Sequence, residues 1–158
     1  MTNYYCLVTG LPDLSLDDGK LNYTVANFKT ELYPQLSKED KKLIDLFYLK
    51  FDNENLLKLL KDKEAVIDAS LGNYSVDELL SVINSFKEEL PPDKKFPSYF
   101  YQFAALYLDS SEEERIGIED QLYGYYYDYA MSSSNAFVSS WYELNLNVNN
   151  ILSALSAR

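Results

Sequence analysis

The residues of this chain that could do chemistry are carboxylates, amides and phenols, because histidine is absent and Cys6 is the single cysteine. These absences exclude Ser-His-Asp and Cys-His nucleophilic systems, as well as zinc and haem sites that depend on such ligands. A carboxylate-pair hydrolase would need two acids about 5 to 9.5 Å apart across a cleft. Glu112 to Glu114 are consecutive and diverge around a helix, so they fit a first helical turn better. We therefore expect no catalytic residue, no cofactor, no metal and no enzyme activity.

The most informative polar residues lie in a segment that occurs twice. Residues 47–60 (FYLKFDNENLLKLL) resemble residues 142–155 (YELNLNVNNILSAL). Four pairs are identical and four are conservative: Leu49/Leu144, Asn55/Asn150, Leu57/Leu152 and Leu60/Leu155, then Phe47/Tyr142, Phe51/Leu146, Asp52/Asn147 and Leu56/Ile151. Such self-similarity predicts an architecture of copied helical units.

On a helix, each copy places a polar pair within an apolar stripe. Steps of three or four residues put Asp52 on the stripe of Leu49 and Leu56, with Asn55 within reach of it. Asn147 and Asn150 take the same places in the second copy. Buried polar side chains must be hydrogen-bonded, so the favoured interpretation is a bridge to neighbouring helix termini that fixes register. The alternative makes the two pairs part of a partner-binding surface.

Tyrosine is unusually abundant, with 15 copies. Five fall within seven positions: Tyr123, Tyr125, Tyr126, Tyr127 and Tyr129. On a helix they surround the whole circumference, so they cannot all face one core. Packing between helices is the first interpretation, and a protein interface is the second, since tyrosine offers a large contact area with a polar tip. A stacking platform for a small ligand is the third.

The pattern of apolar residues, caps and breakers predicts an all-α fold of antiparallel helices. The run Tyr4–Val8 is too short to distinguish a strand from a helical turn, and Cys6 within it is expected to be buried. Helices are predicted over about 24–33, 37–63, 75–89, 98–108, 112–131 and 135–157, with Ser75 and Glu78 forming a capping box. These form a single domain of two related repeats, about 24–90 and 98–158. The apolar rhythm still runs at Leu155, which favours the front portion of a longer protein.

The charge of the chain restricts its partners. Lys and Arg number 14 against 25 Asp and Glu, a formal net charge of −11. So acidic a surface repels nucleic acid and anionic lipid. No signal peptide and no apolar run of about 18 residues is present, which predicts a cytoplasmic protein without direct membrane insertion. Any membrane association would then depend on protein partners.

Two stretches resemble known families. The opening segment Tyr4-Tyr5-Cys6-Leu7-Val8-Thr9-Gly10-Leu11-Pro12-Asp13-Leu14 resembles an uncharacterised bacterial family encoded among V-type ATPase subunits. The pattern aromatic-x-Leu-x-apolar-Asp/Asn-x-x-Asn-Leu/Ile-Leu of the repeated segments is similar to the signature helix of the C subunit, also called the d subunit, of rotary V/A-type ATPases. Its matching residues are Asp52, Asn55, Leu56, Asn147, Asn150 and Ile151. The second copy departs from the first by carrying Asn147 where Asp52 stands.

The resemblance implies a funnel-like helical protein that joins the central shaft of the ATPase to its membrane rotor ring during proton or sodium transport. It would be peripheral on the inner membrane, would transmit torque and would catalyse nothing. The alternative is a general helical adaptor or scaffold that mediates protein–protein contacts.

Overall fold

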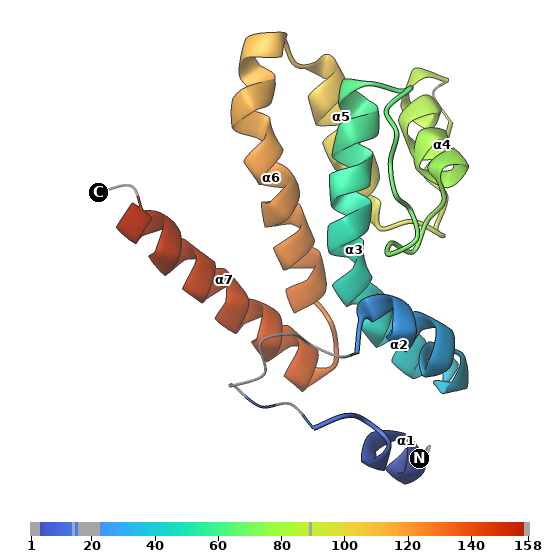
Figure 1. The fold of residues 1–158 in the computed structure, drawn as a ribbon. Helices are drawn as coiled ribbons and strands as arrows, with labels where there is room; N and C mark the ends of the chain where they lie inside the picture. The colour runs from blue at the N-terminus through green and yellow to red at the C-terminus, as the bar shows by residue number, and fades with distance from the viewer. Residues whose placement is uncertain (1–3, 14, 16–22, 89, 157–158) are drawn as a thin grey trace. The chain divides into compact units, whose positions relative to one another are not determined.

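The structure, a computed structural model, describes residues 4–13, 15, 23–88 and 90–156, and every regular element among them is helical (Figure 1). The elements are α1 (Tyr5–Thr9), α2 (Val25–Glu31), the 3-10 helix η1 (Tyr33–Gln35), α3 (Lys38–Lys61), α4 (Val76–Lys87), α5 (Ser98–Asp109), α6 (Glu112–Met131) and α7 (Ala136–Ser156). The expected all-α class is confirmed. The chain forms two compact units, residues 1–45 and 46–158, and the division between them falls inside α3.

Short polar contacts organise the first unit. The Thr24 hydroxyl accepts the N–H of Asn27 at 3.1 Å, and the Asn27 side chain accepts the N–H of Thr24, which caps α2. At the start of α3, the N–H of Asp40 donates to Ser37 Oγ at 3.1 Å. The Tyr4 hydroxyl donates to the Asp40 carboxylate at 2.6 Å and accepts the N–H of Ser37 at 2.8 Å. The Ser37 hydroxyl donates to the same carboxylate at 2.7 Å, and the hydrogen bonds from the Tyr4 and Ser37 hydroxyls hold the pKa of Asp40 below its ordinary value.

The second unit packs its helices in chain order: α4 against α5, α5 against α6 and α6 against α7 (Figure 1). Its fully buried apolar side chains come from α3 to α6: Leu56, Leu59, Leu79, Val82, Ile83, Phe100, Phe103, Ala104, Leu122 and Ala130. From α7, Val138 and Tyr142 are buried. The core therefore lies among α3 to α6, and α7 borders it with one face of its first half.

Helix boundaries follow the capping signals closely. The Ser75 N–H donates to the Glu78 carboxylate at 2.7 Å and the Glu78 N–H donates to Ser75 Oγ at 3.3 Å, so the predicted capping box is confirmed. The helix expected over 24–33 instead ends at Glu31, and the chain continues as η1. The ring of Pro34 disfavours the α conformation at the residue before it, which explains the earlier end. The run at Tyr4–Val8 is largely helical. The expectation that Cys6 is buried was wrong: α1 leaves its side chain exposed.

Candidate functional site

Asp52 is a fully buried carboxylate of α3 that holds the segment returning towards α4. The N–H of Asn73 lies 2.9 Å from both of its oxygens, and the N–H of Tyr74 donates to Oδ1 at 3.1 Å. Three positions further along α3, Asn55 donates from Nδ2 to the carbonyl oxygen of Asp68 at 2.9 Å. Charge-assisted hydrogen bonds of this kind are what a buried carboxylate requires. Asp52 and Asn55 therefore attach the non-helical residues 62–75 to α3, just before the cap of α4.

Gly72 allows this backbone to come so close. A Cβ added there would lie 3.0 Å from Asp52 Cγ and closer still to Oδ1, far inside van der Waals contact. Asn53, the next residue on α3, is fully buried and accepts a hydrogen bond of 2.7 Å from the Tyr99 hydroxyl. Its Nδ2 atom has no hydrogen-bond partner among the residues that the structure describes. The buried side of α3 is thus polar at its centre and closely packed around it.

The matching residues of α7 lie in a different environment. Asn147 and Asn150 are exposed, whereas Asp52 and Asn55 are buried. The apolar positions show the same contrast, since Leu49 and Leu56 are buried while their counterparts Leu144 and Ile151 are 57% and 60% exposed. Two similar helical segments therefore differ in what covers them: α3 is covered by the rest of its own unit and α7 is open.

The five tyrosines of α6 separate by direction. Tyr126 points inwards, where its hydroxyl donates to the Leu46 carbonyl oxygen at 3.0 Å and lies 2.8 Å from the Tyr142 hydroxyl. Tyr129 packs against the ring of Tyr99, with a centroid separation of 5.4 Å. Tyr123 and Tyr127 line a groove, while Tyr125 is half-buried outside that groove. Because the five tyrosines surround α6, some of them pack between helices and others lie on an open surface.

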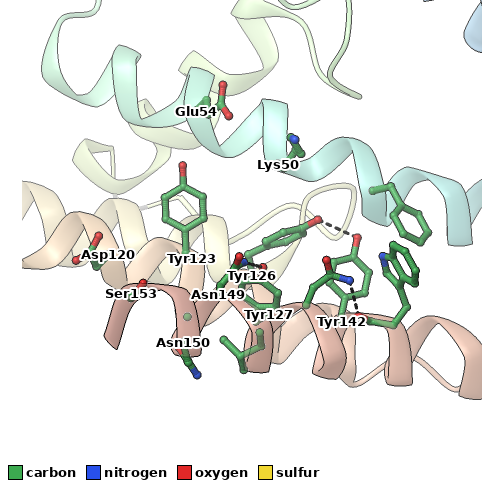
Figure 2. A pocket seen from close by; sticks show the side chains of 15 residues that line it. Lys50, Glu54, Asp120, Tyr123, Tyr126, Tyr127, Tyr142, Asn149, Asn150 and Ser153 are labelled. Atoms are coloured by element: carbon green, nitrogen blue, oxygen red, sulfur yellow. Dashed lines mark hydrogen bonds between the residues drawn. The ribbon is translucent and has the colours of Figure 1, made fainter. Parts of the chain in front are cut away.

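The groove lies between the middle of α3, from Phe47 to Glu54, and the helices α6 and α7, all within residues 46–158 (Figure 2). It has a volume of about 820 Å³. Aromatic rings and amides dominate its wall, with charges from α3 and α6: Phe47, Tyr123, Tyr126, Tyr127, Trp141, Tyr142, Asn145, Asn149, Asn150, Lys50, Glu54 and Asp120. Figure 2 shows the hydrogen bond between the Tyr126 and Tyr142 hydroxyls. The wall is also held by Asn149 Nδ2, which donates to the Tyr127 hydroxyl at 2.8 Å, and by Asn145 Nδ2, which donates to the Trp141 carbonyl oxygen at 2.7 Å.

Three phenols of this groove, those of Tyr123, Tyr126 and Tyr142, are neutral hydrogen-bonding groups near neutral pH. Burial, with the hydrogen bond to Tyr142, raises the pKa of Tyr126 far above its ordinary value. Burial likewise raises the pKa of Tyr142 to about 12. Burial and then the nearby Glu54 and Asp120 carboxylates raise the pKa of Tyr123. None of these phenols supplies a phenolate base near neutral pH, so the groove offers aromatic contact area and hydrogen bonds.

Sequence reasoning missed several groove residues. Trp141, Asn149 and Lys50 were not selected, although Asn149 lies seven positions after Tyr142 and therefore on the same face of α7. Among the described parts of the chain, no cluster of three or more metal-binding side chains occurs, and no helix is long and apolar enough to cross a membrane. The selected pairs Asp52/Asn55 and Asn147/Asn150 are not brought together: the first holds residues 62–75, and the second lies on the open helix.

Comparison with curated proteins and with solved structures gives no match. A family model does match, and it covers the entire chain from residue 1 to residue 158. The chain therefore belongs to the family described as "Protein of unknown function (DUF2764)".

Proposed function

We propose that this chain is a non-catalytic, protein-binding subunit whose α3–α6–α7 groove receives part of another protein. The observation that carries the proposal is the aromatic groove itself. Tyrosine and tryptophan are the residues that contribute most to protein interfaces, because they bury a large area at small entropic cost and keep a polar tip. Tyr123 and Tyr127 of α6 and Trp141 of α7 provide this combination in the lining of the groove.

The openness of the groove favours a polypeptide over a small molecule. Sites for small ligands enclose most of the ligand surface. Here Tyr123 and Trp141 remain 40% and 44% exposed, so the rim is open along α6 and α7. An elongated segment could lie along the groove, contact the rings and reach the amides of Asn145 and Asn149.

The identity of the partner is proposed from the resemblance to the C subunit of rotary V/A-type ATPases. In this proposal the chain couples the central shaft to the membrane rotor ring and catalyses nothing. Its support is the motif carried twice, by Asp52, Asn55 and Leu56 and by Asn147, Asn150 and Ile151, together with the opening segment of the chain. A general helical adaptor is the second candidate, which the same groove supports without specifying a partner.

Affinity purification from gently solubilised membranes of the native host tests the proposal. We expect the tagged protein to co-purify with rotor-ring and central-shaft subunits, and Tyr123→Ala to lower their recovery about tenfold or more through loss of a groove ring. Tyr125→Ala is the matched control, since it removes the same side chain from the same helix outside the groove. Equal recovery of the partner subunits with both variants would contradict a role of the groove in binding. Absence of ATPase subunits from the purified material would contradict the proposed identity of the partner.

A further inference from the structure

A second surface covers the outer face of α7 and shares only Trp141 with the groove. Seven large apolar side chains form it, each between 44% and 71% exposed: Phe137, Trp141, Leu144, Val148, Ile151, Leu152 and Leu155. Six of them follow alternating steps of four and three residues, which aligns them in one stripe along the helix. We call these seven residues the outer stripe.

The outer stripe is large enough to be one half of a stable interface. At about 200 Å² for a whole large apolar side chain, the exposed fractions correspond to roughly 800 Å². The largest apolar patch of a typical monomer is about 300–600 Å², whereas a standard interface buries about 800 Å² on each partner. The stripe therefore matches the requirement for a partner and exceeds what an isolated surface normally exposes.

The charge of α7 restricts what can cover the stripe. Between Ala136 and Ser156 the helix carries one charged residue, Glu143, although a quarter of the whole chain is charged. A neutral face offers nothing to a nucleic acid or to a highly charged peptide. Helices that lie on membranes are typically rich in Lys and Arg on their polar face, and α7 has none. The complementary surface is therefore apolar and uncharged.

The matching face of α3 shows which element such a face accepts. Leu49, Leu56 and Leu60 correspond to the stripe residues Leu144, Ile151 and Leu155, and all three are buried within their own unit. Within that unit α5 contacts this face of α3, where the Tyr99 hydroxyl donates to the buried Asn53 at 2.7 Å, and α5 packs against α4, which follows the extended segment. That segment donates backbone N–H groups to Asp52 and offers a carbonyl oxygen to Asn55. Asn147 and Asn150 stand at the equivalent positions of α7, beside the stripe.

We propose that the outer stripe binds a helical hairpin of a partner protein, introduced by an extended segment with glycine where it crosses Asn147. A backbone N–H of that segment donates to Asn147 Oδ1, and Asn150 Nδ2 donates to one of its carbonyl oxygens. The hairpin then covers Leu144, Ile151 and Leu155. The inference rests on the proposed protein-binding function. Trp141 and Asn150 also line the groove, whereas Tyr123 belongs only to the groove and Ile151 only to the stripe, so substitutions at Tyr123 and Ile151 test the two sites separately.

Trp141 provides a direct test, because it is the only tryptophan of the chain and belongs to the stripe. The probe is a synthetic peptide of residues 62–109, which comprises the extended segment, α4 and α5 and contains no tryptophan. We expect the peptide to shift Trp141 emission to the blue and to reduce its quenching by iodide. Ile151→Glu should abolish both effects by placing a charge in the stripe.

Two substitutions examine the polar contacts specifically. Asn147→Asp should tighten binding about tenfold, because a carboxylate accepts stronger hydrogen bonds from backbone N–H groups than an amide does. Gln121→Glu is the matched control: it makes the same charge change at an exposed position of α6 and should have no such effect. A peptide with Gly72→Ala should bind at least tenfold more weakly, since its Cβ would meet the residue at 147 as it would meet Asp52.

Several outcomes would overturn the proposal. The first is an unchanged Trp141 emission. The second is an emission shift that gives the same binding affinity for the wild-type pair, for Asn147→Asp and for the Gly72→Ala peptide. A blue shift that depends on the concentration of the chain without peptide would assign the stripe to a second copy, and one produced by uncharged phosphatidylcholine vesicles would assign it to lipid. As an independent measurement, a benzoylphenylalanine photo-crosslinker at position 151 of the full chain in its host should capture a helical hairpin of another protein. Crosslinks confined to copies of this chain, or none, would refute it.

Discussion

Replacing Gly72 by alanine tests the account of the buried Asp52 contact. The added Cβ would lie 3.0 Å from Asp52 Cγ, and Asp52 cannot move freely, because it accepts the N–H groups of Asn73 and Tyr74. Relieving the clash requires a shift of the segment and the loss of at least one of these hydrogen bonds. Overpacking costs about 1–3 kcal/mol and a hydrogen bond to a charged group about 1.5–3 kcal/mol. We therefore expect Gly72→Ala to lower the free energy of unfolding by about 3–5 kcal/mol.

Urea denaturation followed by circular dichroism at 222 nm measures this loss. With an m-value of about 2 kcal/mol/M, the midpoint should fall by roughly 2 M urea. Gly117→Ala is the matched control, because nothing lies within 4 Å of a Cβ added there and the position is inside α6. That substitution should stabilise the protein by about 0.5–1 kcal/mol through its helix propensity.

A double-mutant cycle identifies the cause of the loss. In a background of Asp52→Ala the carboxylate is absent, so Gly72→Ala should cost less than about 1 kcal/mol. If Gly72→Ala costs little in the wild-type chain, or costs equally in both backgrounds, the proposed steric conflict with Asp52 is wrong.

Two further predictions concern buried polar groups of the second unit. Asn53→Leu alone should destabilise the protein by about 1–3 kcal/mol, since it leaves the Tyr99 hydroxyl unpaired; together with Tyr99→Phe the change should be close to neutral, and thermal unfolding of the single and double variants measures it. If the double variant loses as much stability as Asn53→Leu alone, the unpaired Tyr99 hydroxyl is not the cause of the destabilisation. Tyr142 has a folded pKa raised to about 12, so its contribution to stability is fully present below the ordinary value near 10 and is lost as pH rises through 12. Urea titrations between pH 9 and 12 should show that the free energy of unfolding falls more steeply with pH for the wild type than for Tyr142→Phe. Equal slopes for the two proteins would refute the raised pKa of Tyr142.

Helix positions could be predicted from sequence because their signals are local. Ser75 and Glu78 are three residues apart and close their capping box without any distant partner. Ser111 likewise donates its N–H to the Glu114 carboxylate at 2.9 Å, where the predicted helix begins. A proline ends a helix through its ring and its lack of a backbone N–H, which are local properties. The predicted end of α2 therefore differs from the observed end by only a few residues.

The burial of each helix face could not be predicted, because it depends on which distant segment packs there. The stripes of α3 and α7 look alike in sequence, yet one is buried and the other is open. The groove also depends on packing between distant segments. Lys50, Tyr123 and Asn149 belong to three helices, and only the packing of these helices brings the three residues together. The close approach of Gly72 to Asp52 is equally non-local, since a glycine in a loop carries no sign of the carboxylate it faces.

The difference between Asp52 and Asn147 is consistent with the different burial of their helices. A carboxylate that leaves water loses a large solvation energy, and hydrogen bonds must compensate for it. Asp52 is buried once, during folding, and two backbone N–H groups remain in place to compensate. An aspartate at position 147 would lose its solvation at every binding event, whereas the neutral amide of Asn147 loses far less. The stronger hydrogen bonds of a carboxylate outweigh this larger solvation loss by the roughly tenfold gain expected for Asn147→Asp, so asparagine makes the weaker and more readily reversed contact of the two.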